Sequence, residues 1–193
     1  MKKKEKETIK KLTKQTKSEK SNLIWVLEIT IIAMIISFVF SFGSETILPN
    51  VNAFLGIIIV ILFICLGILF DIIGVAVTAA NEKPFHSMSA QKVRGAKVAI
   101  IFKNNANKVS SFCNDVIGDI CGIISGSAGV IVATSIADSF SLNIFLTTLT
   151  VTSLIAALTI GGKALGKSIA INKSNMILYE FAKTVSYFYN PKR

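Results

Sequence analysis

Signatures of catalysis and cofactor binding are scarce in this sequence. Its 193 residues include a single histidine, His86, and only three prolines and one tryptophan. The sequence contains no Ser–His–Asp arrangement, zinc-ligand spacing, nucleotide-binding loop or H-E-x-x-H motif. The three cysteines lie inside apolar stretches at spacings that match no metal knuckle, so we interpret them as packing residues. We therefore expect no enzyme, and no cofactor unless it is a metal ion.

Long apolar runs, in contrast, are abundant. The apolar fraction is 52% and the mean hydropathy is +0.63, and these residues are gathered into runs rather than dispersed. A helix needs about 20 apolar residues to cross the hydrocarbon layer of a bilayer. Four runs are about that long or longer: 23–42, 51–80, 112–136 and 142–160. Because they lack the alternation of barrel strands, we predict an all-α integral membrane protein with four transmembrane helices.

The basic residues predict which way the helices run. Nine of the 21 Lys and Arg residues lie in 1–20, six in 82–111 and six in 163–193, whereas the connections 43–50 and 137–141 hold none. The positive-inside rule then places both termini in the cytoplasm and makes the chain a multi-pass protein of the cell membrane. We attribute the net charge of +10 to this topology and to attraction by anionic lipids of the inner leaflet. No nucleic-acid-binding pattern accompanies the lysines, so we expect no nucleic acid partner.

These patterns divide the chain into four segments. Residues 1–20 form a basic cytoplasmic tail, 21–50 a first transmembrane helix with its outer turn, 51–175 a three-span domain, and 176–193 an aromatic and basic cytoplasmic tail. Within the third segment, residues 82–111 have the pattern of amphipathic helices at the cytoplasmic face of the membrane, and the aromatic residues after Lys163 suggest another. The second apolar run is thirty residues long, so we expect its helix to tilt or to break near residues 71–74, and Pro84 to end it.

Carboxylates interrupt the second and third apolar runs. Asp71 lies in the second run, and Asp115 and Asp119 lie four residues apart near the start of the third, where one helix face would carry both. A charged side chain within a membrane costs about 2.5–3.5 kcal/mol on insertion scales, so each carboxylate needs a cation, a metal ion or a proton. Beside them runs a stripe of glycines that would let another helix approach closely: Gly118, Gly122 and Gly126.

Two interpretations of the carboxylates remain open at this point. In the first, Asp71, Asp115 and Asp119 converge in an oxygen-rich pocket for a hard cation such as Mg²⁺. Asn114 is a lesser candidate ligand, and the hydroxyls of Thr78 and Ser125 are further oxygens that could join the pocket. In the second, the carboxylates have a structural role and pair with lysines near the inner surface, including Lys163.

The order of four motifs resembles the transmembrane domain of the CNNM/CorB/CorC family of Mg²⁺ and Co²⁺ transporters. Residues 70–76 (FDIIGVA) stand where the family has F-S-x-S-E-x-A, and residues 95–99 (GAKVA) are similar to its basic connecting segment. Residues 114–119 (NDVIGD) match the spacing of G-N-x-L-V-N, and residues 162–170 (GKALGKSIA) look like G-E-I-I-P-K-T-L-A. The resemblance covers roughly residues 60–175, and makes the first span an added helix. It implies three transporter-like spans, ion binding near residues 114–119, and a homodimer.

This sequence departs from the family pattern at the ion-binding positions. Lys163 stands in place of a glutamate, Gly166 in place of a proline, and Asp115 and Asp119 in place of two asparagines. The paired CBS domains and the CorC-type C-terminal domain of the family are missing as well, so we expect no regulation by nucleotides. The leading hypothesis is a reduced divalent-cation transporter with a metal site at Asp71, Asn114, Asp115 and Asp119. The alternative is a non-transporting accessory or scaffold protein in which Lys163 neutralises the aspartates.

Overall fold

All elements of the structure are helical. The computed structural model describes the backbone of residues 2–48 and 51–188, and the side chains of these residues from Leu23 onward. No strand occurs in these ranges. Four helical segments are long and apolar enough to cross a membrane: Leu23–Ile47, Ala53–Ala79, Ala106–Phe140 and Ile144–Asn172. The predicted helical fold and the four long apolar helices are therefore confirmed.

The chain divides into two compact units, residues 1–38 and 39–193. The first unit consists of most of helix α1 (Lys2–Ile47). Its apolar part holds one acidic residue, Glu28, and large apolar side chains such as Leu27 and Met34 are exposed there. The last residues of α1 belong to the second unit, which contains all the other helices.

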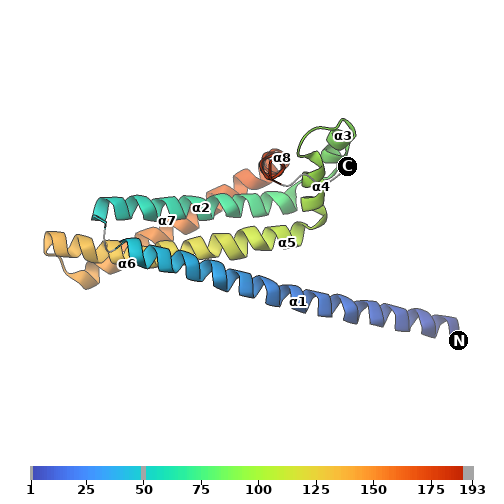
Figure 1. Ribbon diagram of the computed structural model, residues 1–193, viewed down its shortest axis with the longest axis horizontal. Coiled ribbons are helices and arrows are strands. Elements are labelled where there is room, and N and C mark those ends of the chain that lie inside the picture. The colour runs from blue at the N-terminus through green and yellow to red at the C-terminus, as the bar shows by residue number, and fades with distance from the viewer. Residues whose placement is uncertain (1, 49–50, 189–193) are drawn as a thin grey trace. The chain divides into compact units, whose positions relative to one another are not determined.

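Three long helices form the second unit's bundle. Helices α2 (Ala53–Ala79), α6 (Asp119–Phe140) and α7 (Ile144–Asn172) run side by side and pack pairwise (Figure 1). Helix α6 continues a helical path that begins with α5 (Ala106–Ser111) and the π-helix η2 (Phe112–Gly118). The bundle core, which we call the bundle cluster, is formed by these buried side chains: Leu48, Val60, Ile64, Ala128, Val132 and Ile155.

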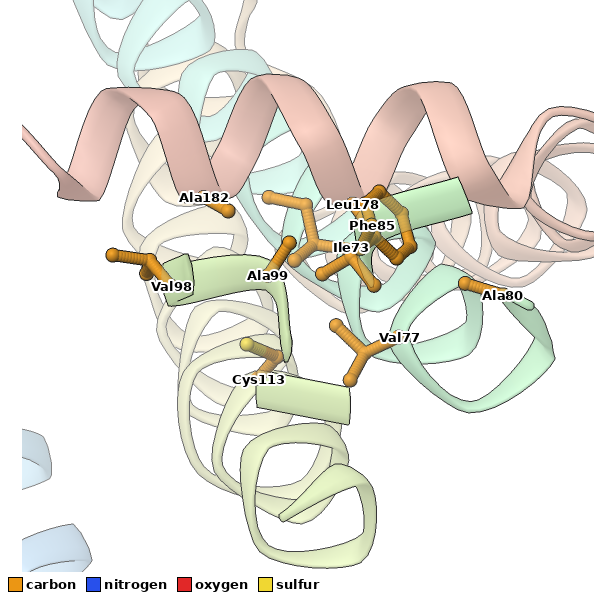
Figure 2. Packing of buried hydrophobic residues seen from close by; sticks show 9 residues of the cluster. All are labelled: Ile73, Val77, Ala80, Phe85, Val98, Ala99, Cys113, Leu178 and Ala182. Atoms are coloured by element: carbon orange, nitrogen blue, oxygen red, sulfur yellow. The ribbon is translucent and has the colours of Figure 1, made fainter. Parts of the chain in front are cut away.

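Short helices gather around the end of α2 and form a second core. They are α3 (Lys83–Ala90), α4 (Ala96–Asn104) and α8 (Ser174–Val185), and Figure 1 shows them at one end of the bundle. Their apolar faces meet α2 and η2 in what we call the cap cluster (Figure 2). Its buried members are Ile73, Val77, Ala80, Phe85, Val98, Ala99, Cys113, Leu178 and Ala182. The segments with amphipathic patterns are thus helical, and they pack against α2.

The long helices differ from the prediction at their ends. Helix α2 is continuous through residues 71–74, where a break was one of the two expectations. Pro84 does not end α2, as was predicted, because α2 already ends at Ala79. Pro84 lies instead in the first turn of α3, where a residue without an N–H group is well accommodated. The fourth apolar run was expected to end at residue 160, but α7 continues to Asn172. Lys163 therefore lies within a long helix.

Candidate functional site

Glycines allow three helices to meet closely around Lys163. On α7, Gly162 packs against Ile68 of α2, and a Cβ atom added at Gly162 would overlap that side chain. A Cβ atom at Gly166, one turn further along α7, would lie 2.7 Å from Ile72. On the other side of α2, a Cβ atom at Gly67 would lie 3.3 Å from the carbonyl oxygen of Gly118. Since a larger side chain at these positions would separate the helices, the glycines determine how deeply Lys163 reaches between them.

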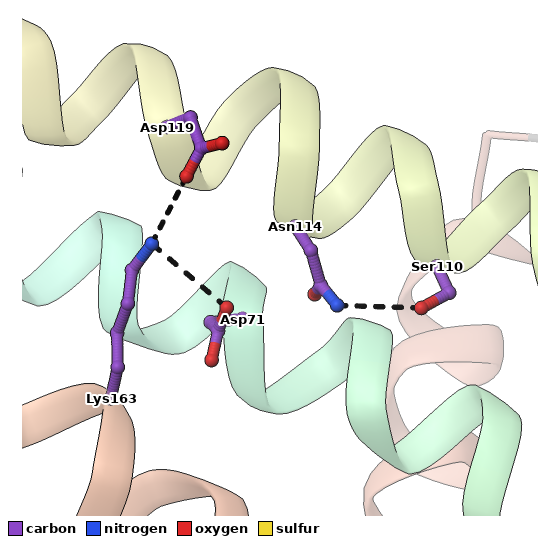
Figure 3. A network of polar contacts seen from close by, with 5 residues as sticks. All are labelled: Asp71, Ser110, Asn114, Asp119 and Lys163. Carbon is purple, nitrogen blue, oxygen red and sulfur yellow. Dashed lines mark hydrogen bonds and ion pairs between the residues drawn. The ribbon is translucent and has the colours of Figure 1, made fainter.

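The ammonium group of Lys163 lies between two carboxylates. Its Nζ atom is 3.3 Å from Oδ1 of Asp119 on α6 and 3.9 Å from Oδ1 of Asp71 on α2 (Figure 3). The contact with Asp119 also satisfies hydrogen-bond geometry. The two carboxylates differ in environment, because the Asp71 side chain is 7% exposed and the Asp119 side chain 63%. One lysine thus links three helices through a buried and an exposed acid, and we call this cluster the Lys163 junction.

Two buried acceptor atoms beside the junction have no donor. Oδ2 of Asp71 and Oδ1 of Asn114 accept no hydrogen bond from any residue that the structure describes. The Asn114 side chain points from η2 toward α2, where a Cβ atom at Gly74 would overlap its amide (Figure 3). Its Nδ2 atom donates to Oγ of Ser110 over 3.4 Å. Because buried polar atoms are nearly always paired, these two oxygens mark a polar position that the protein's own donors leave incomplete.

Asp115 lies apart from the junction. It is exposed, and no hydrogen bond or ion pair joins it to another residue in the described ranges, whereas Asp119 contacts Lys163. Residues 112–118 form a π-helix rather than the α-helix that the sequence predicts. Of the four predicted site residues, the structure brings Asp71 and Asp119 together through Lys163. It places Asn114 one turn of α2 away, opposite Gly74, and leaves Asp115 outside.

The hydroxyl groups expected near the carboxylates bond to their own helices. Oγ1 of Thr78 donates to the carbonyl oxygen of Val75, and Oγ of Ser125 donates to that of Gly122. Within the described part of the chain, no three or more His, Cys, Asp or Glu residues form a group that could hold a metal ion. The junction offers two carboxylates and one amide, with a lysine among them. Its immediate chemistry is that of an ion-pair network.

A second lysine connects the cap helices to α2. Lys103 of α4 donates from Nζ to the carbonyl oxygen of Thr78 over 2.7 Å and to that of Val77 over 3.3 Å. These carbonyls belong to the last turn of α2, where a helix has unpaired acceptors and favours a cation. The backbone N–H of Asn81 donates to Oδ1 of Asn175, the second residue of α8. Neither contact was predicted, because no sequence pattern relates α4 or α8 to the end of α2.

A search of protein-family models, curated proteins and solved structures found no match to this chain. The Lys163 junction and the distribution of apolar and charged residues are therefore the features that bear on function.

Proposed function

We propose that the four long apolar helices span the cell membrane, with both termini and the cap helices in the cytoplasm. Large apolar side chains are exposed along the long helices, for example Leu62 on α2 and Leu146 and Leu158 on α7. Lipid tails would cover such side chains favourably. Between residues 51 and 188, every basic residue lies in 82–111 or 163–188, which hold the cap helices and the adjoining end of α7, as the positive-inside rule requires of the cytoplasmic side. Anionic lipids of the inner leaflet are the partner that this charge favours.

In that orientation the Lys163 junction would lie near the inner boundary of the hydrocarbon layer. With a rise of about 1.5 Å per residue, Asp71, Lys163 and Asp119 are about 27, 29 and 32 Å from the opposite ends of their helices. A bilayer core is about 30 Å thick. Water is scarce at this depth, so the two carboxylates need a countercharge that the protein supplies.

The function that this geometry supports best is that of a non-transporting accessory or scaffold protein of the membrane. The observation that carries the proposal is the position of the Lys163 ammonium, 3.3 Å from Asp119 and 3.9 Å from Asp71. A lysine there supplies the charge that a bound metal ion would otherwise provide. It also joins α2, α6 and α7, which favours one fixed arrangement of these helices over the rearrangement that transport requires.

A second candidate is the transport of divalent cations, Mg²⁺ and by extension Co²⁺. The observation that favours it is the pair of buried acceptors without donors, Oδ2 of Asp71 and Oδ1 of Asn114. Oxygen atoms of carboxylates and amides are suitable ligands for hard cations. Transport would require Lys163 to leave the junction when the ion enters.

Flux of Mg²⁺ into vesicles that contain the purified full-length chain separates the two candidates. We expect wild-type flux equal to that of empty vesicles, and a melting temperature that does not rise with Mg²⁺. Flux above this background that disappears in the double variant Asp71→Asn, Asp119→Asn would replace the accessory role with transport. The variant Lys163→Glu adds a third carboxylate to the junction, so we expect it to unfold at a clearly lower temperature than wild type.

We also propose a homodimer, with the free face of α6 as its contact surface. A Cβ atom at Gly122 or Gly126 would meet no atom within 4 Å, and Ile123 between them is 63% exposed. Small residues on a membrane helix permit the close approach of a second helix. The variant Ile123→Cys, with the native cysteines changed to serine, should crosslink between two copies in membranes. Leu165→Cys, on a face expected to meet lipid, is the control. If the Ile123→Cys variant stays monomeric under oxidising conditions, this surface is not the dimer contact.

A further inference from the structure

We propose that one edge of the cap binds anionic phospholipid headgroups of the membrane that the long helices span. This surface, which we call the α4–α8 edge, consists of the start of α4 with the turn before it and the residues that follow α8: Lys92, Arg94, Lys97, Tyr187 and Phe188. The inference rests on the proposed membrane orientation. It adds which surface of the cap meets the lipid and which lipid chemistry that surface recognises.

Two contacts hold the halves of the edge together. The guanidinium of Arg94 lies 3.8 Å from the centre of the Tyr187 ring. Beside Arg94, a Cβ atom at Gly95 would lie 2.8 Å from the Cα atom of Lys183, which belongs to the last turn of α8. The basic turn and the aromatic residues therefore form one continuous surface.

The positive charge of this surface is not neutralised by the chain. Residues 83–111 contain six basic residues and no acidic one. Lys92 and Lys97 are exposed, and neither forms an ion pair with a residue that the structure describes. Glu180 of α8 pairs instead with Lys183, at 3.8 Å. Exposed cations without acidic neighbours, close to a membrane, favour anionic lipid as their partner.

The aromatic part of the edge is suited to a membrane interface. Phe188 is 92% exposed, the highest value among the large apolar residues that the structure describes, and Tyr187 is 64% exposed. Figure 2 shows Leu178 and Ala182 of α8 buried in the cap cluster, so the apolar face of this helix is already covered by protein. The rings beyond the end of α8 are left for lipid, and aromatic rings beside basic residues are typical anchors at headgroup depth.

The position of α8 along α2 places the edge at that depth. Helix α8 packs against Ile73 and Val77, which follow Asp71 by about 3 and 9 Å along α2. In the proposed orientation Asp71 lies near the inner boundary of the hydrocarbon layer, and the headgroup layer beyond it is about 5–8 Å thick. Figure 1 shows α8 end-on, across the direction of the long helices. Helix α8 therefore runs along the membrane surface and directs its aromatic end toward the surrounding lipids.

A single tryptophan reports whether the edge meets lipid. The full-length variant Trp25→Phe, Tyr187→Trp is reconstituted in vesicles of phosphatidylcholine brominated near the headgroup end of its acyl chains, because bromine quenches indole fluorescence at short range. We expect the tryptophan at position 187 to lose much of its fluorescence. The control is Trp25→Phe, His86→Trp on α3, which lies beyond the end of α2 (Figure 1) and should lose little.

The preference for anionic lipid is measured with the same tryptophan in mixed vesicles of phosphatidylcholine and phosphatidylglycerol, with bromine on one lipid at a time. Quenching should be stronger when the anionic lipid carries the bromine. Adding Lys92→Gln and Lys97→Gln should lower this preference by about fivefold or more, the factor that one cation near an anionic surface contributes. Lys83→Gln with Lys173→Gln removes the same charge outside the edge and should leave the preference unchanged.

The native Trp25, within the candidate span Leu23–Ile47, shows separately whether the wild-type chain is inserted. Quenching of Trp25 without quenching at position 187 would overturn the inference and leave the proposed function intact. Equal quenching by the two brominated lipids, unchanged by the Lys92 and Lys97 substitutions, would overturn the recognition of anionic headgroups. Absence of quenching at both positions would reject the proposed spans together with the inference.

Discussion

The bundle cluster and the cap cluster share helix α2 but are built in opposite ways. In the bundle, α7 buries few side chains and exposes Leu149 and Leu158, so apolar residues lie both inside and outside. In the cap, Phe85 and Leu178 are almost completely buried, and charged residues such as Lys97 face outward. The cap therefore follows the pattern of a water-soluble protein, and the bundle that of a protein surrounded by lipid. The change occurs along α2 near Asp71, within the Lys163 junction.

This difference predicts that equal changes will have unequal effects in the two regions. The buried cysteines provide separate reporters, because Cys113 belongs to the cap cluster and Cys121 lies beside the Lys163 junction. Labelling by a fluorogenic maleimide during heating, in variants that retain one of these thiols, reports when each region opens. Labelling of Cys113 therefore reports the opening of the cap.

The largest effect is expected for Leu178→Ala. Leu178 is 0% exposed in the cap cluster, so its removal leaves a cavity and should cost about 2–5 kcal/mol of unfolding free energy. The control is Leu165→Ala on α7, where the side chain is 73% exposed and the loss should stay within about 0.5 kcal/mol. The stabilities of the two variants are compared by the temperature at which Cys113 is half labelled during heating. Equal losses would show that the cap is not packed as a water-soluble core.

The next effect is expected for Gly95→Ala. Gly95 has a φ of 85°, and a Cβ atom there would lie 2.8 Å from the Cα atom of Lys183 on α8. An alanine would be strained at this φ and would press α4 away from α8, at a cost of about 1–3 kcal/mol. Gly161→Ala on α7 is the matched control, since its Cβ atom would meet nothing within 4 Å. Cys113 labelling should begin at a lower temperature only in the Gly95 variant, and an unchanged onset there would contradict the close contact.

A smaller effect is expected for Lys103→Met, which removes both hydrogen bonds to the last turn of α2. Loss of a charged donor at a partly exposed helix end should cost about 1.5 kcal/mol. Lys97→Met on the same helix is the control, because Lys97 is exposed and, within the described residues, donates to no carbonyl oxygen of α2. Hydrogen exchange should accelerate in residues 76–80 of the Lys103 variant. Equal exchange in both variants would remove Lys103 as a link between cap and bundle.

The smallest effect is expected for Arg94→Gln. The Arg94 guanidinium lies 3.8 Å from the centre of the Tyr187 ring, a cation–π contact at an exposed site. Its loss should cost about 0.5–1 kcal/mol. Arg94→Lys keeps a cation over the ring, so it should lose less unfolding free energy than Arg94→Gln. If Arg94→Gln and Arg94→Lys have the same melting temperature, the contact contributes through packing rather than through charge.

Much of the fold follows from the sequence, because long apolar runs leave the backbone few alternatives to a helix. The four runs predicted the four long helices, but their ends were misjudged where a helix continues beyond its apolar stretch, as α7 does through Lys163 and Lys167. The cap could be predicted only as short amphipathic helices. Their packing depends on contacts between distant segments, such as Phe85 with α8, that no local pattern encodes.

The junction was predicted in part. Lys163 was considered as a partner for any of the three aspartates, because it lies near the predicted inner surface, and the structure places its ammonium 3.3 Å from Asp119 and 3.9 Å from Asp71. Asp115 was grouped with Asp119 by its spacing of four residues, but of the two only Asp119 contacts Lys163, and residues 112–118 form a π-helix rather than an α-helix. A π-helix depends on how the surrounding helices hold the segment, so the six letters from Asn114 to Asp119 do not reveal it.

The π-helix also selects which residue type faces α2. Such a segment contains one residue more than an α-helical segment between the same neighbours. If η2 were α-helical and α6 stayed in place, Asp115 would take the position that Asn114 holds against Gly74. A third acid would then face α2 about one helical turn from Asp71. By the insertion of one residue, the helix presents a neutral amide to α2 and turns the third acid outward.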